Sequence, residues 1–115
     1  LAVSIGTSHG NYPDGKVPEF DIERLSQIKK LTGAPLVLHG GSGSGKENIL
    51  NAVKAGINKI NVGCDFMNAN LSAISKQLKE NPETNFFDLI HQTEKESEEL
   101  VRYYIGLSGS ENKNK

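Results

Sequence analysis

The chain has 115 residues, of which 36% are hydrophobic and 23% charged, and its formal net charge is -1. This length is enough for one domain with one core. Because nucleic acids and membrane surfaces attract basic faces, the balanced charge predicts neither as a partner. No apolar run approaches the roughly 18 residues of a membrane helix. A single cysteine cannot form an internal disulfide, which predicts a reducing, cytoplasmic location.

Three short apolar runs, each ending in glycine, are typical of buried strands: residues 1–6, 35–40 and 59–63. The stretch DIERLSQIKKL between the first two predicts a helix with Asp21 as its N-cap and a stop at residues 33–35. Its apolar face is expected to comprise Ile22, Leu25, Ile28 and Leu31.

The stretch KENILNAVKAG predicts a second helix, which turns Ile49, Leu50 and Val53 inward and stops at Gly56. Two longer helices are expected in FMNANLSAISKQLKEN and NFFDLIHQTEKESEELVRYYIGL. Residues 108–115, SGSENKNK, predict a disordered polar tail after a structured part of residues 1–107.

The resulting order, strand–helix–strand–helix–strand–helix–helix, predicts an α/β fold with parallel strands and right-handed crossovers. Three parallel strands leave two open sheet edges. We therefore expect either a small domain that pairs with something else or the last part of a larger α/β fold. A chain that opens in mid-strand favours the second possibility.

Residues 40–46, GGSGSGK, match the G-x-x-x-x-G-K pattern of a phosphate-binding loop. In that loop a Ser or Thr follows the lysine and ligates Mg²⁺, whereas Glu47 follows it here. A carboxylate at this position would repel bound phosphates. We predict that Lys46 is a solvated residue in the first turn of a helix, and nucleotide hydrolysis is disfavoured.

His9 and His39 follow the first and second predicted strands, at the strand ends where parallel α/β folds bind ligands. The two imidazoles could converge on one metal ion, although catalytic zinc takes three protein ligands. Two histidines that form hydrogen bonds within their own loops remain the alternative.

Glycines also follow the second and third strands, and exposed backbone amides in such loops bind anions. In (β/α)8 barrels the phosphate lies between the loops after strands seven and eight. A phosphate site beside a metal indicates an enzyme that acts on a phosphorylated sugar.

The segments AVSIGTSHGNY, PLVLHGGSG and KINVGCD, in this order and at these separations, resemble the carboxyl-terminal part of class II, zinc-dependent ketose-bisphosphate aldolases. Fructose-bisphosphate and tagatose-bisphosphate aldolases are members of this family. The resemblance extends to about Leu107. It implies that residues 1–107 form about strands 6–8, with the following helices, of a (β/α)8 TIM barrel.

The resemblance implies that His9 and His39 are zinc ligands and that Asn61 is catalytic through a hydrogen bond to the enediolate. It implies that Arg102 binds the far phosphate across a subunit interface, in a complete protein that is a homodimer or homotetramer. A Na⁺ or K⁺ ion is expected beside the near phosphate. The residues implied to bind that phosphate are Gly10, Gly40, Gly41, Ser42, Asn61, Gly63 and Cys64.

The implied reaction is the zinc-dependent aldol cleavage of a ketose 1,6-bisphosphate into dihydroxyacetone phosphate and glyceraldehyde 3-phosphate, or the reverse condensation. Fructose 1,6-bisphosphate is the first choice of substrate and tagatose bisphosphate the alternative. Two departures leave the sugar open: Cys64 stands where the family usually has Thr, and Gly63 where many fructose-bisphosphate enzymes have Asp.

The family's third zinc ligand and its proton-transfer carboxylates come from earlier strands, so this chain alone is expected to be inactive. A non-catalytic module derived from the barrel is the other class of function. It is disfavoured because a module without catalytic activity does not require His9, His39 and Asn61 together at strand ends. His91 is predicted to be an ordinary helix residue, and Cys64 a small loop residue rather than a nucleophile.

Overall fold

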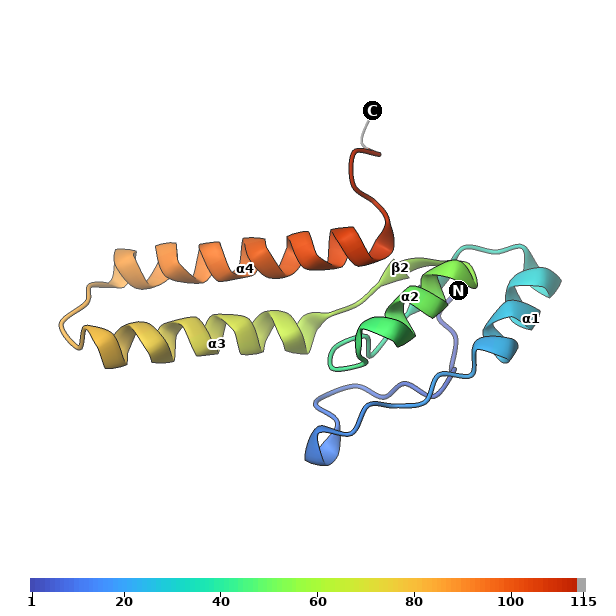
Figure 1. Ribbon diagram of the computed structural model, residues 1–115, viewed down its shortest axis with the longest axis horizontal. Helices are drawn as coiled ribbons and strands as arrows, with labels where there is room; N and C mark the ends of the chain where they lie inside the picture. The colour runs from blue at the N-terminus through green and yellow to red at the C-terminus, as the bar shows by residue number, and fades with distance from the viewer. Residues whose placement is uncertain (114–115) are drawn as a thin grey trace. The chain divides into compact units, whose positions relative to one another are not determined.

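The computed structural model describes residues 1–113 and forms two compact units, residues 1–62 and the residues from Gly63 onward. The order of elements confirms the predicted alternation of helices and strands, except at the amino-terminal end (Figure 1). The elements are η1 (Pro13–Gly15), α1 (Ile22–Thr32), β1 (Leu36–Leu38), α2 (Lys46–Lys54), β2 (Ile57–Ile60), α3 (Gly63–Glu80) and α4 (Phe86–Ser108).

The sheet of the first unit is parallel, as predicted. β1 and β2 pair with Val37 opposite Lys59 and with Leu38 opposite Ile60. On the other side of β1, Ala2 forms a single parallel bridge to Val37, and the Val37 N–H donates to the Leu1 carbonyl at 2.9 Å.

The prediction of a full strand over residues 1–6 is wrong, because the chain leaves the sheet after its first residues. The carbonyl of Ile5 accepts a hydrogen bond from the Asp21 N–H at 2.9 Å instead of pairing with β1. Gly6 then takes a φ of 100°, and a Cβ there would lie 2.4 Å from the carbonyl oxygen of Glu19. Close contact with residues 19–21 therefore replaces the strand ladder.

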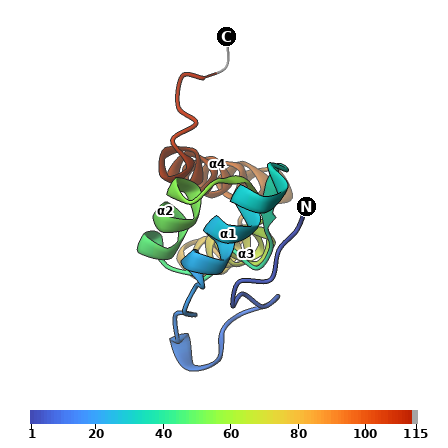
Figure 2. The same ribbon diagram turned by 90° about the vertical axis from the view of Figure 1, so that its right-hand side faces the viewer.

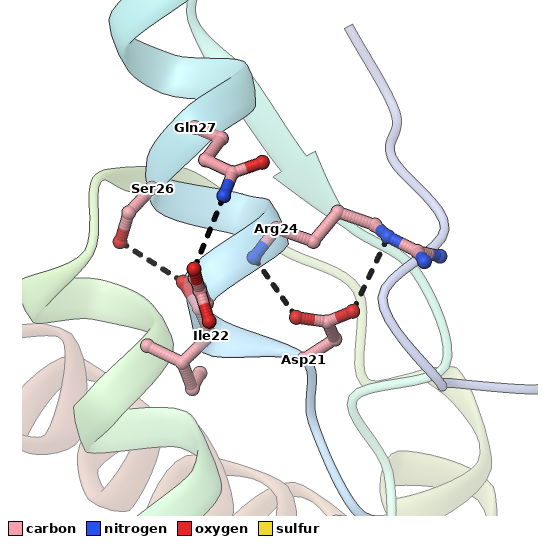
Figure 3. A network of polar contacts seen from close by, with 6 residues as sticks. Asp21, Ile22, Arg24, Ser26 and Gln27 are labelled. Carbon is pink, nitrogen blue, oxygen red and sulfur yellow. Dashed lines mark hydrogen bonds and ion pairs between the residues drawn. The ribbon is translucent and has the colours of Figure 1, made fainter.

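The amino-terminal end of α1 is held by polar contacts of the kind the sequence predicts (Figure 3). The Asp21 carboxylate accepts from the Arg24 N–H at 2.9 Å and forms an ion pair with the Arg24 Nε at 3.2 Å. One turn on, Gln27 donates to the Glu23 carboxylate at 3.2 Å. Gly33 ends the helix in the left-handed conformation, as expected for a C-terminal stop.

The prediction that Leu31 belongs to the apolar face of α1 is wrong, since this residue is 84% exposed. Lys29 faces the unit there: a Cβ on Gly56 would lie 2.9 Å from its side chain, and its ammonium donates to the Ala34 carbonyl at 3.0 Å. Residues two apart on a helix point in nearly opposite directions, so Leu31 is turned to solvent.

The core of the first unit lies between the sheet and its helices, where α1 packs against α2 and α2 packs against β2. Segment 6–20 forms an open loop that carries η1 away from α1 and α2 in both views (Figures 1 and 2). The buried apolar residues of this unit are Ile5, Phe20, Leu25, Leu36, Leu38, Ile49, Ala52 and Ile57.

The second unit is a helical hairpin in which α3 and α4 lie side by side in both views (Figures 1 and 2). Ser97 of α4 donates to the side-chain oxygen of Asn70 of α3 at 3.1 Å. Within residues 1–113 no helix has the length and apolar character needed to cross a membrane.

The boundary between the third strand and α3 corrects a prediction. The strand expected over residues 59–63 ends at Ile60, and Gly63 and Cys64 form the first turn of α3 rather than a loop. The last ladder bond runs from the Asn61 N–H to the Leu38 carbonyl at 2.9 Å. Beyond that bond the two segments are joined by the Gly41 N–H, which donates to the Asn61 carbonyl at 3.1 Å.

At the carboxyl-terminal end, α4 runs to Ser108 and Gly109 caps it in the left-handed conformation. The predicted polar tail of residues 108–115 thus begins with a helical residue. Its last two residues, 114 and 115, lie outside the described residues, and its disorder stays a prediction.

Candidate active site

The structure brings together the two histidines that follow the amino-terminal segment and β1. The rings of His9 and His39 are stacked, with centroids 5.3 Å apart and an angle of 22° between their planes. His9 is exposed and His39 is half-buried. Both therefore present imidazole nitrogens in a place that solvent and small ligands can reach.

Asn61, which directly follows β2, lies at the nitrogen-bearing edge of the His39 ring. Its Nδ2 is 3.1 Å from Nδ1 of His39 and 3.4 Å from Nε2. The Lys59 ammonium donates to the Asn61 Oδ1. Since a lysine can only donate, this contact fixes the carboxamide so that its NH₂ group faces the imidazole.

The loops that carry the two histidines are joined by the side chain of Tyr12. Its hydroxyl oxygen accepts from the Ser8 N–H at 3.2 Å, and the hydroxyl donates to the Gly40 carbonyl at 3.1 Å. Ser8 precedes His9 and Gly40 follows His39. One phenol group thus links the backbone next to each histidine.

Gly40 and Gly41, which follow β1, allow their loop to lie close to the neighbouring segments of the chain. Gly40 has a φ of 64°, and a Cβ there would lie 2.3 Å from the Ser8 carbonyl oxygen. A Cβ on Gly41 would lie 2.8 Å from the Ile60 side chain. The Gly41 N–H donates to the Asn61 carbonyl at 3.1 Å, and Ser44 Oγ donates to the Gly40 carbonyl at 3.0 Å.

Gly10, Ser42 and Lys46 are the other predicted residues in or next to these loops. Gly10 has a φ of 97°, and a Cβ there would meet no atom within 4 Å. Ser42 is 5% exposed. Lys46 is the first residue of α2 and is exposed, which confirms the prediction of a solvated first-turn lysine.

The remaining predicted site residues belong to the second unit. Gly63 and Cys64 open α3, so their backbone amides are among the N–H groups that have no acceptor within the helix. Arg102 pairs with Glu98 along α4, with 2.5 Å between Nη2 and Oε1. His91 is an exposed helix residue as predicted, 3.8 Å from Glu94. The binding roles of Gly63, Cys64 and Arg102 stay predictions.

The histidine pair fits part of a zinc site. Imidazole nitrogens are ligands that zinc prefers, and a catalytic zinc ion takes three protein ligands. Within residues 1–113, no group of three His, Cys, Asp or Glu side chains is placed to hold a metal. A third ligand would have to come from elsewhere. The pair borders an open depression of about 360 Å³ lined by Ala2, Val3, Ser4, Thr7, His9 and His39.

Sequence reasoning missed the contacts made by Tyr12, Ser44 and Lys59. The signal for Tyr12 is local, since it lies three residues after His9 and directly before the turn at Pro13–Gly15. No comparable signal marks Ser44 or Lys59, although their partners Gly40 and Asn61 are only four and two residues away.

The chain as a whole is similar to known proteins. A family model described as fructose-bisphosphate aldolase class-II matches residues 1–113. The crystal structure of the YdjI aldolase from Escherichia coli K12 superposes with a TM-score of 0.82 at 31% sequence identity. The match covers 100% of this chain and 40% of that chain, so the chain spans well under half of that aldolase.

The chain belongs to the class II fructose-bisphosphate aldolase family. The predicted resemblance is thereby confirmed, and so is the α/β fold class of a segment of a (β/α)8 barrel.

Proposed function

We propose that the complete protein carrying this chain is a zinc-dependent aldolase. It cleaves a ketose 1,6-bisphosphate, with fructose 1,6-bisphosphate as the first choice, into dihydroxyacetone phosphate and glyceraldehyde 3-phosphate. The observation that carries the proposal is the stacked pair of His9 and His39 with the Asn61 amide at the ring edge, in a chain of this family.

His9 and His39 would hold the zinc ion together with a third ligand from outside the described residues. When bound, zinc supplies a Lewis acid that polarises the substrate carbonyl. Each imidazole would bind the metal through the lone pair of one ring nitrogen.

Asn61 would donate a hydrogen bond to the substrate oxygen on which negative charge develops. A preoriented donor stabilises such charge without reorganising during the reaction. Support comes from the Lys59 contact, which directs the Asn61 NH₂ group toward His39. Lys59 thereby acts on the reaction through Asn61.

The glycine-rich loops would bind the substrate phosphate and so fix the reacting carbons. Gly10, Gly40 and Ser42 remain candidates, with Na⁺ or K⁺ beside the phosphate, and the first turn of α3 at Gly63 and Cys64 offers helix N–H groups. The N–H of Gly41 is already used by the Asn61 carbonyl, so its part would be to allow close packing. Arg102 is proposed for the far phosphate.

The proposal is tested by the cleavage of fructose and tagatose 1,6-bisphosphates by the complete protein. Chelation should lower the rate by more than about a hundredfold, and added Zn²⁺ should restore it. His9→Ala and His39→Ala should lose activity to the same extent, while His91→Ala, on the exposed side of α4, serves as the matched control. Activity that survives both chelation and His39→Ala would contradict the proposal.

Two further parts of the proposal concern the whole protein. The 115 residues alone should be inactive, because the described residues hold only two of three zinc ligands. Cleavage by the isolated chain would contradict this. A cytoplasmic homodimer or homotetramer is expected, which sedimentation of the complete protein would check.

A further inference from the structure

The distance between the two histidines is set by loops rather than by neighbouring strand residues. His9 lies beyond the point where the amino-terminal segment leaves the sheet, since the last pairing with β1 is at residues 1–3. The backbone at His9 therefore needs another support if its ring is to remain beside that of His39.

Tyr12 supplies that support. A phenol has one donor and can also accept, and both capacities are used here. The donor goes to the carbonyl of Gly40 at 3.1 Å, and the oxygen accepts from the N–H of Ser8 at 3.2 Å. Each partner is the backbone of a residue adjacent to one of the histidines.

Gly40 contributes the matching space on the other loop. A Cβ at this residue would lie only 2.3 Å from the carbonyl oxygen of Ser8. The two loops thus meet at Ser8 and Gly40, and the Tyr12 hydroxyl spans that same junction.

We propose that Tyr12 is a positioning residue that sets the spacing of the two metal-binding histidines, an inference that rests on the proposed zinc site. Tyr12 acts through the backbone on either side of the imidazoles. Without its hydroxyl the His9 loop is free to move away from His39, and the metal loses one correctly placed ligand. Partners that orient metal ligands typically affect metal affinity by about 10- to 100-fold.

The phenol ring has a packing role that must be separated from the role of the hydroxyl. A Cβ on Gly43 would lie 3.4 Å from the ring, which places the ring against this loop. Tyr12→Phe keeps that contact and removes only the hydroxyl. Tyr103→Phe removes a hydroxyl from a tyrosine that is 48% exposed on α4 and is the matched control.

The experiment is a titration of the metal-free complete protein with Co²⁺, followed by visible absorption of the bound ion. We expect Tyr12→Phe to raise the Kd for Co²⁺ by about tenfold or more and to change the absorption spectrum. The unfolding temperature of the metal-free protein should match that of Tyr103→Phe. A merely structural residue would change the unfolding temperature and leave the spectrum of bound Co²⁺ as it is.

A second pair of variants tests the loop spacing without touching Tyr12. Gly40 and Gly33 have nearly the same φ, 64° and 62°, but a Cβ meets backbone only at Gly40. Gly40→Ala should weaken Co²⁺ binding relative to Gly33→Ala. If Tyr12→Phe folds poorly, the comparison of Gly40→Ala with Gly33→Ala tests the spacing of the two histidines instead.

The outcomes separate the two proposals. If the wild-type protein takes up no Co²⁺, or His39→Ala takes it up equally well, the proposed zinc site is wrong. If the wild-type protein binds Co²⁺ and Tyr12→Phe binds it with the same Kd and spectrum, the role of Tyr12 is overturned while the zinc site stands. Equal Kd values for Gly40→Ala and Gly33→Ala would overturn it as well.

Discussion

The hydroxyl of Tyr104 donates a hydrogen bond to the carboxylate of Asp65, with 2.5 Å between the oxygens. The two residues are 39 positions apart in sequence, one near the end of α4 and the other at the start of α3. The bond therefore closes the open end of the helical hairpin, opposite the turn between the helices.

Tyr104→Phe should lower the stability of this hairpin by about 1 kcal/mol, because a hydrogen bond to a charged group is lost and the carboxylate stays partly buried. Urea unfolding of the variant, followed by hydrogen exchange at α3 and α4, measures the change. Tyr103→Phe, at the neighbouring exposed position, should differ little from wild type. Equal losses in both variants would speak against a specific bond.

The same bond predicts a pH dependence. Burial, then the hydrogen bond to Asp65 and its negative charge, raise the pKa of Tyr104 well above its ordinary value of about 10. A pKa that is raised on folding contributes stability that is complete below the pKa of the unfolded state. It is lost as the pH rises above about 10 toward the folded-state pKa. Thermal unfolding between pH 8 and 11 should therefore fall more steeply for wild type than for Tyr104→Phe, and parallel curves would contradict this.

Gly6 and Gly10 provide a matched pair for the loop that carries His9. Their φ angles are 100° and 97°, but a Cβ would meet the Glu19 carbonyl at 2.4 Å only in Gly6→Ala. Backbone strain alone costs about 1–3 kcal/mol in such regions, and we expect it in both variants. The added clash should make Gly6→Ala less stable than Gly10→Ala in thermal unfolding, and the reverse order would contradict the geometry.

Asp21 has two contacts that substitution can separate. Asp21→Ala should cost about 1 kcal/mol in urea unfolding, because the N–H of Arg24 loses its cap. Asp21→Asn keeps a side-chain oxygen for the cap and removes only the ion pair with Arg24. That pair is exposed, so its loss should cost less than about 0.5 kcal/mol. Equal costs for the two variants would assign the stability to the ion pair instead.

Asn61→Ala should lower kcat by about a hundredfold or more in the zinc-saturated enzyme, with a smaller effect on KM, because the lost donor acts on developing charge. Steady-state kinetics of the complete protein measure this. Asn51→Ala, on an exposed side of α2, is the control and should be unchanged. A rise in KM at constant kcat would mean that Asn61 only helps to bind the substrate.

The ends of α1 and the parallel order of the strands could be predicted from the sequence. Asp21 and Gly33 bound α1 through contacts with residues within one turn, so the local pattern contains the whole signal. The parallel order of the strands followed from the alternation of helices and apolar runs. The stacking of His9 on His39 joins two loops, since only His39 directly follows a strand, β1.

Features that depend on distant contacts could not be predicted. Leu31 has an apolar side chain at a helical spacing, yet Lys29 takes the inward position. Its ammonium donates hydrogen bonds to the Ala34 carbonyl and to the side-chain oxygen of Asn58. The pairing of Ile5 with Asp21 shortens the first strand, and nothing within residues 1–6 signals that contact. The hydroxyl of Tyr12 likewise has a partner 28 residues away.

The peptide group between Gly40 and Gly41 carries a consequence for electrostatics at this site. Its carbonyl accepts from Tyr12 and Ser44, and its N–H donates to Asn61. With both ends occupied, this peptide cannot rotate, and its dipole keeps one direction beside the imidazole of His39. A dipole that is fixed before a ligand arrives exerts its full field at once, since no part of the interaction energy is spent on turning it.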